Sequence, residues 1–241
     1  MSRTPRVRRL ATWNVGWASG PRQVLVRERL AALDADVIAV TEGTAAALPD
    51  GYSVVTGDAD WGYREQRPDR RKVLLASRLS MSEVVTTGPR GMPGGRIVSA
   101  TIGDRDQAVR VHAVCIPWSH AHVSTGRRDA TAWSQHEAYL IGLAEVLKND
   151  DPGLPRIVMG DFNQRTPRSR QPKRMHDLLL ACLGELRIAT PGVLPGLAAP
   201  GVNHIAVGPG IEIDDVEGIS RHGPDGVSLS DHDGAVATAA C

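Results

Sequence analysis

A succession of short apolar segments, each of strand length and bounded by Gly, Pro or Asp, constrains the fold of this chain most. Only three segments space their apolar residues like an amphipathic helix, at residues 21–33, 128–147 and 175–183. The expected strands are one that ends at residue 15 and those at 37–40, 52–56, 72–76, 81–86, 96–102, 109–116, 156–160, 202–207, 211–217 and 235–239. Many strands with few helices predict sheets packed face to face with helices outside, in a single domain over residues 1–241.

Composition argues against several other classes of protein. The 28 basic and 27 acidic residues nearly cancel, which argues against a tail-type nucleic-acid binder, and aromatic residues are only 4% of the chain, too few to predict stacking platforms. The three cysteines form no CxxC pair, so a thiolate zinc site is not expected. We expect no signal peptide, and no apolar run reaches the roughly 20 residues of a membrane span. The chain is therefore expected to be cytoplasmic, and no protein partner is evident.

Four of the expected strands end at a polar residue able to bind a metal ion or a phosphate. These strand tips are Asn14, Glu42, Asp161 with Asn163, and Asp231 with His232. Each tip alone has a structural explanation, with Asn14 as a turn residue, Glu42 as a turn or helix start, and Asp161 in an Asx turn. Asp231 and His232 could form a solvated turn. All of these explanations must hold together for the tips to carry no chemistry.

The order of these segments resembles the endonuclease/exonuclease/phosphatase superfamily. The matching segments run from residue 11 to residue 237 and are ATWNV, VIAVTEG, KVLLASR, VMGDFN, NHIAV and SDHDGAVA. GDFN and SDH, in this order after WN and a strand-final Glu, are a specific combination, whereas KVLLASR and NHIAV are weak by themselves. The resemblance implies a four-layer α/β sandwich, in which two packed and mostly antiparallel β-sheets are flanked by helices. It also implies a metal-dependent hydrolase of phosphate esters.

An oxygen-only donor set has a physical reason to bind a hard cation. Several carboxylates in one cleft repel one another unless a cation compensates their charge or some of them are protonated. Carboxylate and amide oxygens suit Mg²⁺ or Mn²⁺, whereas zinc would favour His and Cys. We therefore expect Glu42, Asp231 and the Asn14 amide to be the ligands of Mg²⁺ (or Mn²⁺).

The resemblance also implies roles in hydrolysis for three of the tip residues. It implies that Asp161 accepts a proton from the attacking water and that Asn163 contacts the phosphate or that water. It further implies that the imidazole of His232 hydrogen-bonds a phosphoryl oxygen, where negative charge accumulates during the reaction.

Two positions depart from the pattern of the superfamily. Asn203 occupies the place where many relatives have an Asp that orients the catalytic His, and an amide cannot stabilise an imidazolium by charge. Cys115 occupies the place where many relatives have a His or Tyr near the phosphate. We keep Asn203 among the catalytic candidates and Cys115 among the substrate-binding ones. His112, His120 and His122 are candidate substitutes, although a buried strand His or a solvated loop His is the commoner role.

A basic segment directly follows GDFN. Its five cations, with no acid between them, are Arg165, Arg168, Arg170, Lys173 and Arg174. They are either solvated loop charges or a clamp for phosphates, in which Arg165 and Arg168 would be substrate-binding residues. A clamp favours a nucleic acid or another polyanionic phosphate substrate. The alternatives are a small-molecule or lipid phosphate ester, or a catalytically weak binding module on the same scaffold.

Overall fold

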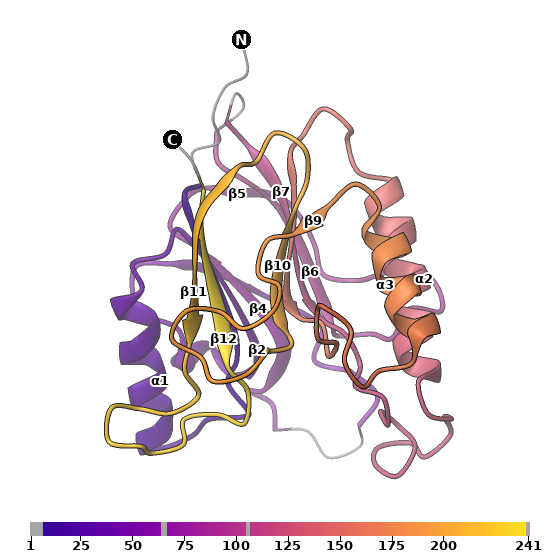
Figure 1. The fold of residues 1–241 in the computed structure, drawn as a ribbon, viewed down its shortest axis with the longest axis horizontal. Coiled ribbons are helices and arrows are strands. Elements are labelled where there is room, and N and C mark those ends of the chain that lie inside the picture. Colours follow the sequence, from indigo (N-terminus) through magenta and orange to yellow (C-terminus); the bar gives the residue numbers. More distant parts are fainter. Residues whose placement is uncertain (1–6, 64–66, 105–106, 240–241) are drawn as a thin grey trace.

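The computed structural model describes residues 7–63, 67–104 and 107–239, which form two six-stranded sheets and three α-helices (Figure 1). The first sheet has the order β11-β12-β1-β2-β4-β3 and consists of β1 Arg9–Asn14, β2 Val37–Gly43, β3 Ser53–Thr56, β4 Arg71–Ser77, β11 Ile213–Ile219 and β12 Gly234–Ala239. The second has the order β5-β6-β7-β8-β10-β9 and consists of β5 Met81–Val85, β6 Ile97–Ile102, β7 Val109–Cys115, β8 Arg156–Asp161, β9 Arg187–Ile188 and β10 Asn203–Val207. The helices are α1 Pro21–Ala32, α2 Ser134–Lys148 and α3 Lys173–Leu183, and a short 3-10 helix covers Ala45–Ala47.

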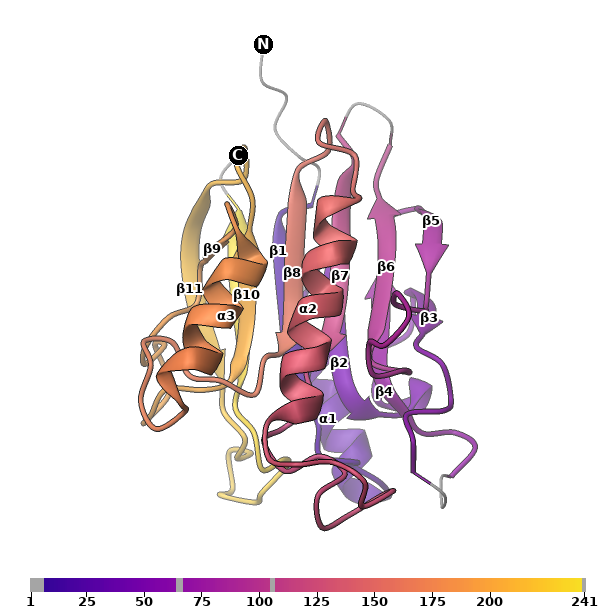
Figure 2. The ribbon, with the colours of Figure 1, turned by 90° about the vertical axis from the view of Figure 1, so that its right-hand side faces the viewer.

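The four layers run from left to right in Figure 1 as α1, the first sheet, the second sheet, and then α2 with α3. Figure 2 shows α2 and α3 side by side over the outer face of the second sheet. Strand β7 illustrates why the layers form, because Val111 and Ala113 belong to the core between the sheets, whereas Val114 packs in the core under α2. Among the described strands, only β1–β2 and β7–β8 pair in parallel. The fold is therefore the four-layer α/β sandwich that the sequence predicts.

The strand register brings the polar tips to one end of the two sheets. In the first sheet, β1 and β2 run parallel, so Asn14 and Glu42 lie at the same edge. In the second sheet, Asp161 at the end of β8 is level with Cys115 at the end of the parallel strand β7. It also pairs with Asn203 at the start of the antiparallel strand β10. Residues far apart in sequence therefore meet here because of strand order alone.

Two elements differ from their predicted form. Helix α2 begins at Ser134, later than the predicted start at Arg128, because Arg128 and Trp133 have φ values of 58° and 71°, in the left-handed region. The short strand β9 has no counterpart among the predicted strands, since two residues show no periodicity. No helix within the described ranges combines the length and the apolarity that crossing a bilayer requires.

Gly160 sets the close approach of β8 to β7 just before Asp161. Its φ is +147°, and a Cβ there would lie 1.9 Å from the Val114 carbonyl oxygen, a backbone atom that cannot move aside. We predict that Gly160→Ala lowers the free energy of unfolding by about 3 kcal/mol, because overpacking forces the strands apart. Urea titration measures this against Gly201→Ala, where nothing lies closer than 3.9 Å. Equal stability of the two variants would contradict this prediction.

Candidate active site

A buried amide–carboxylate contact joins the two sheets where their polar strand ends meet. The Nδ2 of Asn14, at the end of β1, donates a hydrogen bond of 2.8 Å to Asp161 Oδ2, at the end of β8. Both residues are only 1% exposed. The backbone N–H of Asn14 donates to Asn203 Oδ1 at 3.1 Å, so the ends of β1, β8 and β10 are held at one point.

Asn163 closes a tight turn around the Asp161 carboxylate. Its backbone N–H donates to Asp161 Oδ1 at 2.9 Å, and its Nδ2 lies 3.2 Å from Asp161 Oδ2. The same Nδ2 donates to the Ile116 carbonyl oxygen at 2.8 Å, and the residue has a left-handed φ of 51°. The Asx turn that the sequence allows is therefore present, and it holds both polar side chains at the same strand end.

His232 lies beside the same carboxylate. Its Nδ1 is 3.9 Å from Asp161 Oδ2 and its Nε2 is 3.8 Å from Asp231 Oδ2, so a carboxylate faces each ring nitrogen. Burial raises the pKa of Asp161, and His232 together with the Asn14 hydrogen bond offsets only part of this rise. The structure thus brings together Asp161, Asn163 and His232, the three side chains that the sequence links to the hydrolytic steps.

Asn203 makes contacts that differ from those expected of an orienting residue. Its Oδ1 accepts from the Asn14 N–H, and its Nδ2 donates to the Asp233 carbonyl oxygen at 2.9 Å. Both partners are backbone groups, so the side chain fixes the ends of strands and does not orient the His232 ring directly. The carboxylate beside Nδ1 of that ring belongs to Asp161. Asn203 therefore fits a positioning role better than a catalytic one.

Glu42 ends β2 with a left-handed φ of 52° and forms an ion pair with Lys72 of β4. The pair is shielded, since the side chains are 23% and 10% exposed and Lys72 Nζ lies 5.1 Å from the centre of the Trp17 ring. Burial acts to raise the pKa of Glu42, but the positive charges of Lys72, Arg96 and His232 outweigh it, so the pKa is lowered. Because His232 contributes to this shift, Glu42 lies within electrostatic range of the group described above.

Arg96 is a second buried cation, and no sequence pattern marks it. It is 2% exposed, and its Nη1 lies 3.3 Å from the Cys115 carbonyl oxygen and 3.8 Å from Cys115 Sγ. Cys115 is 1% exposed, and burial raises the pKa of its thiol to about 12. A buried neutral thiol offers a substrate no contact, so the structure does not support the predicted substrate-binding role of Cys115. Of the candidate substitutes, His112 and His122 are also buried, which leaves His120 on the surface.

Two carboxylates and an amide are the predicted oxygen donors for a divalent cation. Lys72 occupies Oε1 of Glu42 and leaves the second oxygen, and Asp231 is 77% exposed. A Cβ at Gly16 would lie 2.7 Å from Asp231 Oδ1, so this glycine lets the carboxylate approach the turn that follows Asn14. No group of three or more His, Cys, Asp or Glu side chains is arranged to hold a metal within the described ranges. Mg²⁺ is commonly bound by one or two carboxylates together with waters, so the donor set fits it.

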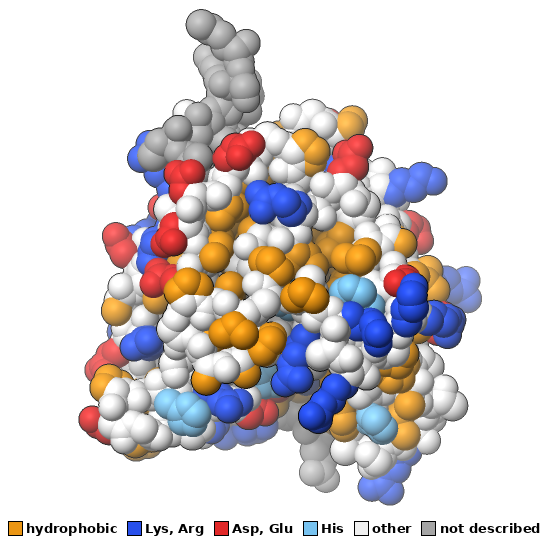
Figure 3. Space-filling model, in the orientation of Figure 1, with side chains coloured by type: hydrophobic (Ala, Val, Ile, Leu, Met, Phe, Trp, Pro, Cys, Tyr) orange, Lys and Arg blue, Asp and Glu red, His pale blue; other side chains and the backbone are white. Residues whose placement is uncertain are grey.

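The basic segment after GDFN divides into two parts. Arg165 and Arg170 line a cavity of about 240 Å³ together with Asn163 and Trp133. Arg168 instead donates to the Gln171 carbonyl oxygen. Lys173 and Arg174 form ion pairs with an acid of α3 and an acid of α2. Figure 3 shows basic side chains gathered on this part of the surface. The cations at the cavity are therefore Arg165 and Arg170, and not the predicted pair Arg165 and Arg168.

His136 and Gln164 brace the wall of this cavity. The Nδ1 of His136 lies 2.7 Å from the Pro117 carbonyl oxygen, which can only accept, so Nδ1 carries the proton. The Nε2 of Gln164 lies 2.8 Å from His136 Nε2 and 2.9 Å from the Met175 carbonyl oxygen, so the amide donates to both. Burial lowers the pKa of His136 to about 4. A neutral imidazole therefore lies behind the wall and holds the Gln164 amide in place.

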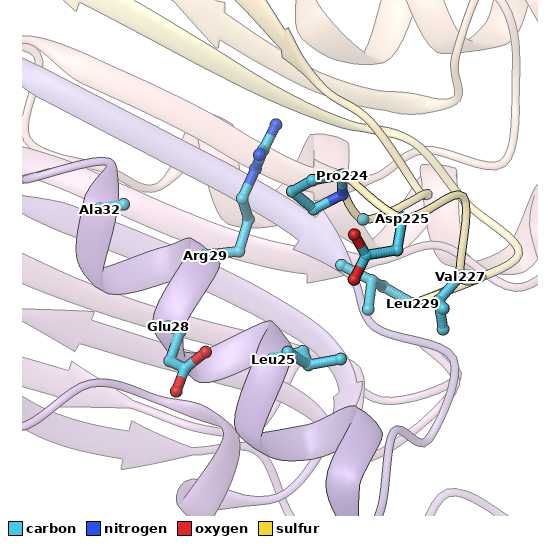
Figure 4. A pocket seen from close by; sticks show the side chains of 9 residues that line it. Leu25, Glu28, Arg29, Ala32, Pro224, Asp225, Val227 and Leu229 are labelled. Atoms are coloured by element: carbon cyan, nitrogen blue, oxygen red, sulfur yellow. The ribbon is translucent and has the colours of Figure 1, made fainter.

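A second cavity, of about 370 Å³, lies on another part of the surface (Figure 4). Helix α1 and the loop 223–229 form it, with Leu25, Arg29 and Val227 in its walls. None of the predicted site residues lines this cavity. The smaller cavity, by contrast, adjoins the candidate site through Asn163.

Four of the five Trp residues lie in loops near the candidate site, although the composition predicts no stacking surface. Trp17 and Trp61 stack with ring centres 5.6 Å apart and an angle of 22° between the planes. Trp118 follows β7 and is 43% exposed, and Trp133 lines the cavity. A low aromatic content of the whole chain therefore does not exclude aromatic side chains at the site, because these Trp residues are concentrated in a few loops.

Residues 11–232 match the model of the endonuclease/exonuclease/phosphatase family, a span that includes every strand tip described above. The chain belongs to this family. It is therefore an enzyme that hydrolyses phosphate esters. Comparison of the sequence with curated proteins gives no significant match.

Solved structures resemble this family member at low sequence identity. An AP endonuclease from Archaeoglobus fulgidus is 15% identical with a TM-score of 0.70, and the match covers 97% of this chain and 99% of that one. The 3′ phosphatase NExo from Neisseria, bound to a product DNA hairpin, is 17% identical with a TM-score of 0.69 and coverages of 97% and 100%. A mannosyl-6-phosphatase from Bacteroides thetaiotaomicron is 14% identical with a TM-score of 0.67 and coverages of 97% and 99%. At such identities the likeness establishes the fold alone.

Lys72 compensates the charge of Glu42 in this endonuclease/exonuclease/phosphatase enzyme. We predict that Lys72→Met lowers the free energy of unfolding by about 3 kcal/mol, because it leaves a shielded carboxylate without its partner. The double variant Glu42→Gln/Lys72→Met is expected to recover at least about 1 kcal/mol of this loss, since no charge is then stranded. Urea titration in EDTA measures all four proteins of the cycle. Additive effects of the two substitutions would contradict the prediction.

The buried neutral His136 makes stability depend on pH. Its pKa is about 4 in the folded chain against 6.5 ordinarily, so between these values the unfolded state binds the proton and the native state does not. The contribution is complete above pH 6.5 and is lost as pH falls towards 4, by about 3 kcal/mol in all. Unfolding free energies measured across this window should fall less steeply in His136→Leu than in the wild type. Identical slopes would show that His136 does not titrate as described.

Proposed function

We propose that the chain is a divalent-metal-dependent phosphodiesterase that hydrolyses the nucleic-acid backbone. The observation that carries the proposal is the Asp161 carboxylate, which is buried among Asn14, Asn163 and His232 at the strand ends. A carboxylate whose pKa burial has raised is better matched to accepting a proton at neutral pH than an ordinary one. The two arginines at the adjoining cavity supply positive charge that attracts a polyanion.

The residues of the site divide the steps of hydrolysis among them. Asp161 accepts one proton from a water that attacks phosphorus in line with the leaving oxygen. The bond between phosphorus and the leaving oxygen breaks, and that oxygen takes a proton from solvent. The His232 ring donates a hydrogen bond to a phosphoryl oxygen, where negative charge accumulates. Both N–H groups of the Asn163 amide are engaged by Ile116 and Asp161, so its Oδ1 is the atom that accepts a hydrogen bond from the attacking water. Asn203 holds the strand ends that carry these groups.

The proposed cation is Mg²⁺ or Mn²⁺, and when bound it stabilises negative charge on the phosphate. Glu42, Asp231 and the amide oxygen of Asn14 would hold it, with waters in the remaining positions. Lys72 engages one oxygen of Glu42 and so keeps this carboxylate oriented towards the site.

Nucleic acid is the substrate class that the observations favour. Two guanidinium groups and an indole at one cavity suit a chain of phosphates that carries bases. Two of the structurally similar proteins are an AP endonuclease and a 3′ phosphatase bound to a DNA hairpin, and we extend that preference to this chain. The competing substrate is a small-molecule or lipid phosphate ester, consistent with the similar mannosyl-6-phosphatase.

A hydrolysis panel tests the proposed substrate. It spans DNA, RNA, a lipid phosphodiester, inositol phosphates and a bis-aryl phosphodiester, each with Mg²⁺ or Mn²⁺ and again with chelator. We expect cleavage of nucleic acid that falls steeply as salt increases and stops with chelator. Cleavage of only the small-molecule or lipid esters would show that the enzyme has the competing activity and is not a nuclease. No cleavage of DNA, RNA or the bis-aryl ester would end the enzymatic proposal.

Substitution of Asp161 is predicted to impair the chemical step, whereas substitution of Glu42 is predicted to impair metal binding. Asp161→Asn should lower kcat on the bis-aryl phosphodiester by about 100-fold to 10,000-fold, because it removes the proton acceptor, and should leave Mg²⁺ affinity nearly unchanged. Glu42→Gln should weaken Mg²⁺ binding itself, which calorimetry measures directly. Unchanged Mg²⁺ affinity in Glu42→Gln would remove Glu42 from the ligand set, and a near-normal kcat in Asp161→Asn would remove Asp161 as the base.

A further inference from the structure

Gln164, a residue of the wall of the cavity beside Asn163, carries a buried acceptor without a partner. Gln164 is 1% exposed and contributes to the wall. Because its Nε2 donates to the unprotonated Nε2 of His136 and to the Met175 carbonyl oxygen, the orientation of the amide is fixed. The Oε1 that remains is buried and has no hydrogen-bond partner. Buried acceptors are normally satisfied, so this oxygen marks a position for the N–H or O–H of a ligand.

Trp133 lines the same cavity in a backbone conformation that bulky residues rarely adopt. Its φ is 71°, and the strand–helix connection imposes this value through hydrogen bonds from Trp133 N to the Ser119 carbonyl oxygen at 2.6 Å and from Glu137 N to the Trp133 carbonyl oxygen at 2.9 Å. The edge of the His136 ring contacts the indole at 5.1 Å between centres. Strained residues of this kind persist where their surroundings impose them, and they cluster at functional sites. Here the strain keeps a half-buried indole at the cavity.

Two cations complete the lining. Arg165 is anchored through Nε to the Pro200 carbonyl oxygen at 3.2 Å, which leaves the rest of its guanidinium for a ligand. Arg170 is exposed and lies at the same cavity. An indole, a neutral acceptor and two guanidinium groups together match a base, a nucleoside N–H or O–H, and a phosphate.

We propose that this cavity binds one unpaired nucleotide that flanks the scissile phosphate, with its base against the Trp133 indole. The proposal rests on the nuclease function proposed above. Gln164 Oε1 accepts a hydrogen bond from the nucleoside, and Arg165 with Arg170 binds its phosphate. The volume of about 240 Å³ lies below the ~300–1,000 Å³ of sites for drug-sized ligands, so it suits a single nucleotide. The enzyme therefore acts on single strands or on nucleotides displaced from a duplex.

Calorimetric titration with adenosine 5′-monophosphate and with ribose 5-phosphate, which lacks the base, tests this site. EDTA is present so that the full-length protein binds either compound without turnover. We expect the wild type to bind the nucleotide about ten-fold more tightly than the sugar phosphate, because stacking adds to the phosphate contacts. Trp133→Gly should lose about ten-fold in affinity for the nucleotide alone, and glycine adopts the required φ without strain. Arg170→Ala should weaken both compounds equally, and Lys173→Ala, outside the cavity, is the matched control.

Equal affinity of the wild type for the two compounds would overturn the proposal, and this comparison does not depend on any variant folding. Unchanged nucleotide affinity in a Trp133→Gly protein with normal Tm would overturn it as well, whereas Trp133→Phe, which keeps a ring, should retain the preference. Oligonucleotide hydrolysis by the same preparation separates the two proposals. Cleavage without base-dependent binding removes the nucleotide site alone. Base-dependent binding without cleavage of any phosphodiester removes the nuclease function alone.

Discussion

The hydrogen bond from Asn14 to Asp161 is the contact on which the rest of the site depends. It joins the central strands of two different sheets, and it holds a carboxylate that is only 1% exposed. The cost of burying that charge is reduced by three further contacts, from the Asn163 backbone, the Asn163 amide and His232. Two groups of the same residues, Asn163 Oδ1 and the His232 ring, are proposed to act on the substrate. Structure and chemistry are therefore coupled, because the residues that make a buried carboxylate tolerable also hold the groups proposed for the reaction.

Charge balance explains the second half of the site. Lys72 neutralises much of the Glu42 charge before any cation binds, and the buried guanidinium of Arg96 adds a further positive charge nearby. A cation would therefore enter a cleft whose carboxylates are already partly compensated, with two of them as its protein ligands. With the proposed ligands, this arrangement would make Mg²⁺ binding sensitive to Lys72. The nearby cavity lined by Arg165 and Arg170 has no carboxylate in its lining, so its positive charge is available to attract the phosphates of a substrate.

Much of the fold follows from local sequence. The apolar strands and the polar residues at their ends can be predicted because each depends on residues close to it in the chain, as at Asp161 and Asn163. The side chains that contact the site residues cannot be predicted in this way. Lys72 and Arg96 lie beside Glu42 and Cys115 only because the strands of each sheet place them there. The late start of α2 likewise depends on the left-handed backbone of Trp133. Asn203 was predicted from an aligned position, but its actual hydrogen bonds depend on the ends of three strands.

In the proposed mechanism, strand tips from both sheets act on one phosphate. Diffraction from crystals containing Mn²⁺ and a slowly cleaved phosphorothioate dinucleotide would show this, because Mn²⁺ gives an anomalous signal. We expect Mn²⁺ bound between Glu42 and Asp231, and a phosphate hydrogen-bonded by His232, with a water between phosphorus and Asp161 that also donates to Asn163 Oδ1. Mn²⁺ bound away from Glu42, or a phosphate that does not touch His232, would contradict this mechanism.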